Sequence, residues 1–260
     1  MQYENLDLNI ADAIARITLQ RPEAANAIDL ALAKELAYAA MECDENPSVR
    51  AILITATGRF FCAGGDLASF GAAEDHAPGL LKEITTYLHA AVSRFARTNA
   101  PVITAVNGAA AGAGFSLACA GDLTLAAESA KFTMAYTGVG LTPDGSSTYF
   151  LPKLIGARRS LELMLTNRTL SAREALDWGI VNQVVADEDL AAEAAKLATR
   201  LAKGPTLAYG RTKALVRAER DLEAQMELET RAIADSARSQ DGRTGIRAFI
   251  AREKPKFQGA

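Results

Sequence analysis

Short β-branched runs alternate with amphipathic stretches through the first half of the chain, and this alternation limits the possible folds more than any other feature. Four segments predict strands: residues 14–19, 49–55, 101–106 and 122–126. Two stretches between them carry apolar residues at helical spacing, one capped by Asp29 and one containing Ile84, Leu88 and Phe95. Strands that alternate with helices predict an α/β layer with parallel strand pairing.

The second half of the chain has a different pattern, which favours helix almost throughout. Helical runs are expected in five places: near 157–166, 171–178, 187–203, 206–219 and 221–238. Gly204-Pro205 separates two of these runs. We therefore expect an α/β core over residues 1–200, followed by a helical region over residues 201–260.

Composition excludes several functional classes. The 260 residues carry a net charge of −3, without a basic run that would follow a phosphate backbone, so nucleic acid is not an expected partner. No stretch of about 18 apolar residues predicts a membrane span, and residues 1–19 lack the pattern of a signal peptide, which makes the cytoplasm the expected location. Three dispersed cysteines and two histidines predict neither a disulfide framework nor a metal site.

Two glycine-bearing turns follow predicted strands, at residues 60–67 and 107–114. Small residues at such a junction leave backbone N–H groups unpaired, and these donors suit an oxyanion or a phosphate. A dinucleotide site is not predicted, because Leu117 stands where the third glycine of G-x-G-x-x-G belongs. A Walker loop is also excluded, since no Gly-Lys-Ser/Thr tripeptide occurs. Tight packing is the alternative role for either turn alone.

Taken together, these turns resemble those of the enoyl-CoA hydratase/isomerase (crotonase) superfamily. The resemblance extends over nearly the whole chain and rests on five segments in order: residues 21–27, 61–67, 106–114, 171–181 and 249–257. It implies a spiral of βαβ units with a helical C-terminal trimerisation region, and a homotrimer or a dimer of trimers. The implied substrate is an acyl-CoA thioester, with no cofactor beyond its coenzyme A moiety.

The resemblance also assigns residues to the site. It places the oxyanion-hole donors at the backbone N–H groups of Gly65 and Ala113, which would stabilise negative charge on the thioester oxygen. The further positions that it implies for substrate or CoA binding are Ala25, Ala27, Ala63, Gly64, Asp66, Leu67, Ser116 and Tyr136. For Asp66, capping of the following helix is an equal alternative.

Two positions depart from the pattern of the hydratases in this superfamily. The glutamates that position water there correspond to Ser116 and Tyr136, and a hydroxyl and a phenol do not replace two carboxylates as acid and base near pH 7. Asp144 instead matches the aspartate of isomerases that act on ring-derived and unsaturated acyl-CoAs. We therefore expect an acyl-CoA isomerase that uses Asp144 as acid and base; an N-cap is the structural alternative for this residue.

Two further hypotheses remain open. His89 lies twelve residues before Pro101, a spacing similar to that of a histidine in the 4-chlorobenzoyl-CoA dehalogenases. This resemblance implies an aryl-CoA hydrolase with Asp144 as nucleophile and His89 as base, although Leu88 and Tyr136 replace the tryptophans of that pocket. A solvated helix flank is the simpler role for His89. The third hypothesis is a non-catalytic binder of CoA thioesters.

Overall fold

A six-stranded sheet forms the centre of the computed structural model, which describes residues 3–260. Its strands run in the order β1-β2-β3-β5-β7-β10, with bounds Leu6–Ala11, Ile14–Leu19, Ala51–Ala56, Val102–Val106, Leu123–Ala127 and Gln183–Val185. All neighbouring strands are parallel except β1 and β2, which pair antiparallel. The predicted parallel α/β layer is confirmed.

A second, four-stranded sheet of short strands runs beside the first. Its order is β4-β6-β8-β9, with bounds Phe60–Cys62, Ala109–Ala111, Lys131–Thr133 and Leu170–Ser171. The chain adds one strand to each sheet as it advances: β3 then β4, β5 then β6, β7 then β8. Each of these strands pairs with its counterpart from the next turn of the chain. The expected spiral of βαβ units is therefore present.

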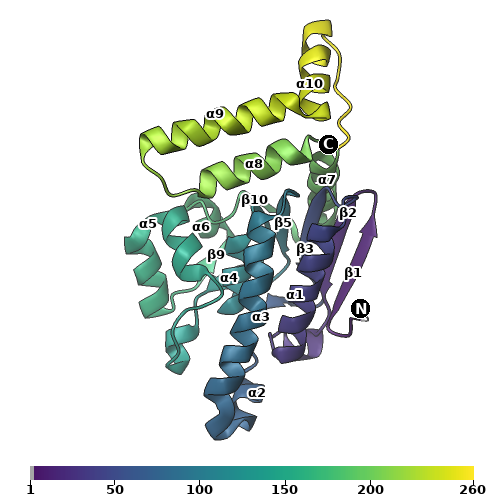
Figure 1. Cartoon of the computed structure of the whole chain (residues 1–260). Helices are drawn as coiled ribbons and strands as arrows, with labels where there is room; N and C mark the ends of the chain where they lie inside the picture. Colours follow the sequence, from purple (N-terminus) through teal and green to yellow (C-terminus); the bar gives the residue numbers. More distant parts are fainter. Residues whose placement is uncertain (1–2) are drawn as a thin grey trace.

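Helices cover both faces of the large sheet (Figure 1). On one face lie α1 (Leu30–Glu45) and α3 (Ala77–Arg97); on the other lies α7 (Leu190–Ala202). Alternation along β3 explains this arrangement, since Ile52 and Ile54 belong to the core under α1 and α3 while Leu53 packs with α7.

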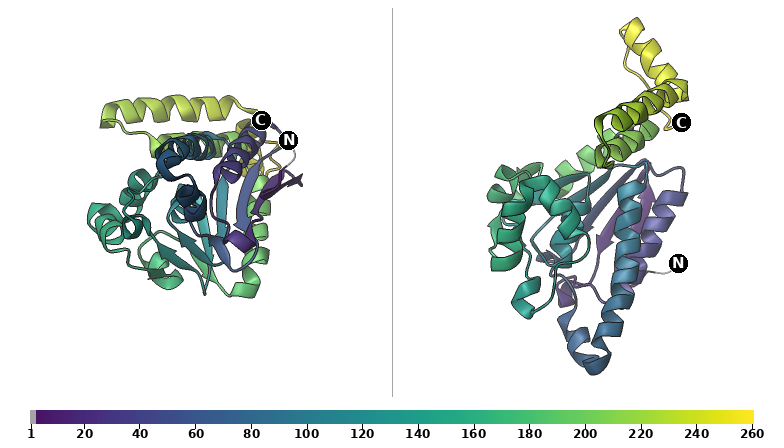
Figure 2. Two further views of the ribbon diagram at one scale, coloured as in Figure 1. Left: turned by 90° about the horizontal axis from the view of Figure 1, so that it is seen from below. Right: turned by 60° about the vertical axis from the view of Figure 1, so that its left-hand side comes forward.

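The remaining helices complete the layers and the C-terminal region. They are α2 (Leu67–Ala72), α4 (Ala113–Ala120), α5 (Ser147–Thr166), α6 (Ala172–Asp177), α8 (Thr206–Arg217), α9 (Leu222–Arg238) and α10 (Gln240–Ala251), with 3-10 turns at Pro22–Ala24, Glu74–His76, Tyr136–Val139 and Asp187–Asp189. Helices α8 to α10 gather at one end, and α9 and α10 project away from the sheets (Figure 2). The carboxylate of Asp122 anchors α8, pairing with Lys213 at 2.8 Å and Arg217 at 2.9 Å.

Some expected bounds differ from the structure. Helix α5 begins at Ser147, about ten residues before the expected start, and carries a kink at Gly156, where φ is 79° and ψ is 157°. This kink interrupts the apolar periodicity on which the expectation was based. Strand β1, the three-residue strands and α10 were not predicted, because short runs and mixed polar sequence carry no clear period.

Within residues 3–260, no helix combines the length and apolarity that crossing a bilayer requires. The same residues contain no group of three or more His, Cys, Asp or Glu side chains placed to hold a metal ion.

Candidate functional site

Two backbone amides meet where neighbouring parallel strands end. Gly65 follows β4 and Ala113 follows β6, and because β4 and β6 pair in parallel, their carboxyl ends lie at the same edge of the small sheet. The backbone of Ile28 pairs with the residues on either side of Gly65: the N–H of Ile28 donates to the carbonyl of Gly64, and the carbonyl of Ile28 accepts from the N–H of Asp66. The N–H of Gly65 therefore points away from Ile28. Ala113 is the first residue of α4, so its N–H has no partner inside that helix.

The two turns touch because glycine leaves room for backbone contact. Gly64 adopts a φ of 103°, and a Cβ added there would lie 3.4 Å from the nitrogen of Ala113. At Gly114 an added Cβ would lie only 2.2 Å from the carbonyl oxygen of Cys62, so any side chain would push β4 and α4 apart. Glycine at these positions therefore fixes the spacing of the two free amides.

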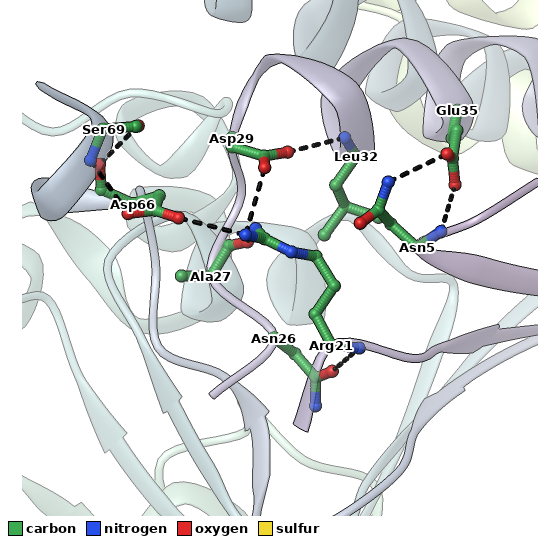
Figure 3. A network of polar contacts seen from close by, with 9 residues as sticks. All are labelled: Asn5, Arg21, Asn26, Ala27, Asp29, Leu32, Glu35, Asp66 and Ser69. Carbon is green, nitrogen blue, oxygen red and sulfur yellow. Dashed lines mark hydrogen bonds and ion pairs between the residues drawn. The ribbon is translucent and has the colours of Figure 1, made fainter. Parts of the chain in front are cut away.

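A polar network holds the first of these turns in place (Figure 3). The guanidinium of Arg21 contacts the carbonyl of Ala27 at 2.5 Å, Asp29 at 3.1 Å and Asp66 at 3.2 Å. Asp29 caps α1, and Asp66 caps α2 by accepting from the N–H of Ser69. Arg21 thus ties the starts of two helices to the turn that carries Gly65.

A cavity of about 350 Å³ opens over the two amides. Its walls are mainly apolar and come from both glycine turns, from α2 and α3, and from the segment between Ala135 and Asp144. Asp144 is the only carboxylate on this lining within residues 3–260. An apolar cavity with paired donors on its floor suits a ligand whose carbonyl oxygen gains negative charge.

The carboxylate of Asp144 is held by a neighbouring phenol. The hydroxyl of Tyr136 donates to Oδ1 of Asp144 at 2.8 Å, and Ser116 Oγ lies 3.1 Å from the same hydroxyl. Ser116 also donates to the backbone carbonyl of Asp144 at 2.9 Å. These bonds orient one carboxylate oxygen and leave Oδ2 for a ligand.

Burial and the neighbouring charge of Asp144 raise the pKa of Tyr136 above its usual value of 10.0. The phenol therefore keeps its proton throughout the physiological range and stays a hydrogen-bond donor to the carboxylate. Tyr136 follows β8, so three consecutive turns of the spiral contribute Gly65, Ala113 and Tyr136 to one cavity.

The backbone just after Asp144 explains how its side chain reaches this point. Gly145 and Ser146 both have positive φ, 59° and 76°, and the chain then enters α5. Ser146 is a non-glycine residue in a disfavoured conformation, of the kind that often marks functional sites. Helix α5 is preceded by Ser146 without a side-chain cap, so the N-cap interpretation of Asp144 is wrong.

The other residues assigned by resemblance lie in and around the cavity. Ala63, Gly64 and Leu67 line it. Ser116 is fully buried and does not reach the lining; it contacts Asp144 and Tyr136 instead. Binding of CoA by any of these residues stays a prediction.

The predicted CoA loop at residues 21–27 lies outside the cavity lining. Ala25 accepts a backbone hydrogen bond from Ala63 at 3.0 Å, and Ala27 accepts from Arg21. Asn26 has no exposed surface, and its side chain bonds the backbone of Arg21, Thr57 and Phe60. This loop therefore braces the turn that carries Gly65.

His89 lies on α3 outside this cavity. It is exposed and lines a second cavity, which Asp144 also borders. Leu88, its neighbour in sequence, is buried and faces the first cavity instead. The structure thus brings His89 and Asp144 to a common cavity, but the two free amides do not line it.

Two functional side chains were not assigned from sequence. Arg21 stands first in the segment of residues 21–27, and its guanidinium contacts three backbone and side-chain partners as far as 45 residues along the chain. Phe70 lies over Gly65, where an added Cβ would approach its ring to 2.7 Å, and it lines the cavity. A charged residue inside a loop motif is the one signal that would have indicated Arg21.

A βαβ spiral with paired free amides beside an apolar cavity is an arrangement suited to stabilising an oxyanion on a bound acyl group. The family model described as enoyl-CoA hydratase/isomerase matches residues 9–260. This chain belongs to the enoyl-CoA hydratase/isomerase family, within the crotonase superfamily.

Relatives within this family carry different activities in their names. The chain is 39% identical to 1,2-epoxyphenylacetyl-CoA isomerase of Escherichia coli K12 over 254 residues, which cover 96% of this chain and 97% of that protein. It is 35% identical to 4-chlorobenzoyl coenzyme A dehalogenase-2 of an Arthrobacter species, over 80% of this chain and 76% of that protein. A crystal structure of an enoyl-CoA hydratase from Polaromonas sp. JS666 superposes with a TM-score of 0.92 at 32% identity, covering 97% of this chain and 99% of that one.

Proposed function

We propose that the protein is an acyl-CoA isomerase that moves a double bond or a ring-derived unsaturation in its substrate. The observation that carries this proposal is the single carboxylate of Asp144, which borders an apolar cavity whose floor holds the free N–H groups of Gly65 and Ala113. One carboxylate is enough for isomerisation, because the same group removes a proton and returns it.

The proposed reaction has two steps. Oδ2 of Asp144 takes a proton from the carbon alpha to the thioester carbonyl of a 3-enoyl substrate; the electron pair of that C–H bond forms a new carbon–carbon double bond, and the carbonyl π pair moves to oxygen, which gives a conjugated enolate. The N–H groups of Gly65 and Ala113 stabilise this oxyanion; losing one such donor costs roughly 3 kcal/mol of barrier. Asp144 then protonates another carbon of the conjugated system, which shifts the double bond without net gain or loss of atoms.

Hydration by a glutamate pair is not supported by these side chains. Ser116 and Tyr136 stand at the corresponding positions, and both hydroxyls are committed to Asp144. Neither group accepts a proton from water near pH 7. The isomerase name of one relative at 39% identity agrees with the proposal.

The hydrolase alternative has one observation in its favour and one against it. His89 and Asp144 border the same second cavity, as a nucleophile and its base would. The free amides border the other cavity, which His89 does not line, so His89 lies apart from the proposed oxyanion site. We therefore prefer the isomerase.

A product analysis over a panel of thioesters tests the proposal. The protein is incubated with 2-enoyl-, 3-enoyl- and epoxidised arylacetyl-CoA, and products are separated and weighed by mass spectrometry. The proposal expects isomers of unchanged mass. Products that have gained water, with no isomer formed, would contradict it.

A matched histidine pair tests the hydrolase alternative, because the chain has only His76 and His89. His89→Gln should isomerise as fast as His76→Gln, whose position lies in an exposed turn after α2. Loss of turnover in His89→Gln alone, with release of free CoA by the parent protein, would favour the hydrolase.

We also propose that residues 201–260 form the oligomerisation region of a homotrimer or a dimer of trimers. Helix α9 has no buried residue in the single chain, although it carries apolar side chains such as Leu222 and Ile233 at 66% and 72% exposure. Phe249 and Ile250 of α10 are exposed by 85% and 76%. Faces of this kind support burial against other copies of the chain.

A further inference from the structure

A second cavity of about 800 Å³ lies between α3, the start of α5 and the end of α8. Among residues 3–260, Asp144 is the one residue that borders both this cavity and the first. Adjacent residues of two segments line different cavities. Leu88 and Thr142 line the first cavity, whereas His89 and Pro143 line the second.

The second cavity differs from the first in charge. Its lining carries His89, Arg97, Arg217 and Arg220, and Asp144 is the only acid among its lining residues. Arg217 is largely neutralised by Asp122, 2.9 Å away. Within residues 3–260, Arg97 and Arg220 form no ion pair with any carboxylate.

The rest of the lining is suited to a carbon chain. Val92, Ala96, Pro143 and Phe150 contribute apolar surface to the same lining. A ligand that fits both features has an aliphatic stretch that ends in an anion. Guanidinium groups pair with carboxylates through two parallel hydrogen bonds, which makes a carboxylate the natural terminus for such a ligand.

We propose that the second cavity receives the far end of the acyl chain and that the substrate class is a thioester of coenzyme A with a dicarboxylic acid. The inference rests on the proposed function in one respect, namely that the acyl group passes beside Asp144. Its carbonyl oxygen lies at Gly65 and Ala113, its reacting carbons lie at Asp144, and its remaining carbons continue into the second cavity. Arg97 and Arg220 pair with the terminal carboxylate.

Binding of saturated thioesters tests this proposal without requiring catalysis. Adipoyl-, suberoyl- and sebacoyl-CoA are compared by titration calorimetry with their methyl-ended counterparts hexanoyl-, octanoyl- and decanoyl-CoA. We expect at least one dicarboxylic thioester to bind about tenfold more tightly than its counterpart, the size of one good charged hydrogen bond. Arg97→Gln and Arg220→Gln should each reduce this ratio toward about one, whereas Arg200→Gln on α7, across the sheet, should preserve it.

Two results would overturn the proposal. In one, no dicarboxylic thioester binds better than its methyl-ended counterpart at any length. In the other, free suberate binds in an Arg97-dependent manner while suberoyl-CoA gains nothing over octanoyl-CoA, which would make the cavity a separate anion site. The proposed isomerase function is tested separately, by measuring isomerisation of methyl-ended enoyl-CoA substrates. If no isomerisation occurred, the binding ratios of the saturated thioesters would be unaffected.

Discussion

At the scale of single residues, the hydrogen bond from Tyr136 to Asp144 is the most specific feature of the site. Tyr136→Phe keeps the ring and removes the donor 2.8 Å from Oδ1. We expect kcat for isomerisation to fall about tenfold, because the carboxylate loses the bond that orients it. KM should change little, since the ring still lines the cavity.

Steady-state kinetics of Tyr136→Phe beside Tyr38→Phe, an exposed position on α1, would measure this effect. Equal kcat values in the two variants would show that the phenol does not position Asp144.

The three cysteines supply a second prediction at this scale. Burial raises the pKa of Cys43, Cys62 and Cys119 to about 12 from 9.0. A raised thiol pKa means that the folded protein keeps protons that the unfolded chain releases as the pH rises above 9, so the free energy of unfolding falls between pH 9 and 12.

Thiol titration at pH 8 should detect almost no reaction in the native protein and all three thiols in denaturant. Prompt reaction of any thiol in the folded state would refute the assignment of these residues to the core.

At the scale of helices and strands, Asp122 attaches the C-terminal helices to the core. Its carboxylate accepts from the N–H of Val102 and pairs with Lys213 and Arg217 of α8. Asp122→Ala leaves two mostly buried cations without a partner, which should lower the free energy of unfolding by roughly 3 kcal/mol.

Urea unfolding of Asp122→Ala, compared with Asp7→Ala on the exposed face of β1, would measure this cost. A loss no larger than that of the control would mean that α8 is held by packing alone.

The elements that sequence could predict are those whose pattern is local. Strands β2, β3 and β5 are rich in β-branched residues and β7 is a short apolar run; the predicted bounds of all four agree with the structure within about two residues. Strands β4, β6 and β8 span three residues each, too short for any period, and they form only because consecutive turns of the spiral bring them together.

The features of the site also fall into two groups, those that the sequence indicates and those that it does not. Gly65 and Ala113 were indicated by motif position, and the structure brings both to one cavity with Asp144. The bond between Tyr136 and Asp144 depends on a 3-10 turn and on the positive φ values of Ala135, Gly140 and Gly145, which no sequence period reports. The second cavity was not predicted, because it joins helices from three distant parts of the chain.

At the scale of the whole molecule, helices α9 and α10 project away from the sheets (Figure 2). The proposed assembly buries their exposed apolar side chains against other copies of the chain. Phe249→Asp places a charge on a side chain that is 85% exposed in the single chain, so it should disturb association without disturbing the fold. Light scattering coupled to gel filtration should find a trimer or hexamer for the parent protein and a smaller species for the variant. A parent protein that is monomeric would contradict the proposed assembly.

The most direct test of the account is exchange of substrate protons in heavy water, followed by mass spectrometry, with the parent protein and Asp144→Asn side by side. Asparagine keeps the size of the side chain and cannot take a proton, so thioester binding should persist while exchange falls roughly 100-fold or more. That result would identify Asp144 as the base acting on a carbon acid. Exchange at the parent rate in Asp144→Asn would contradict the account.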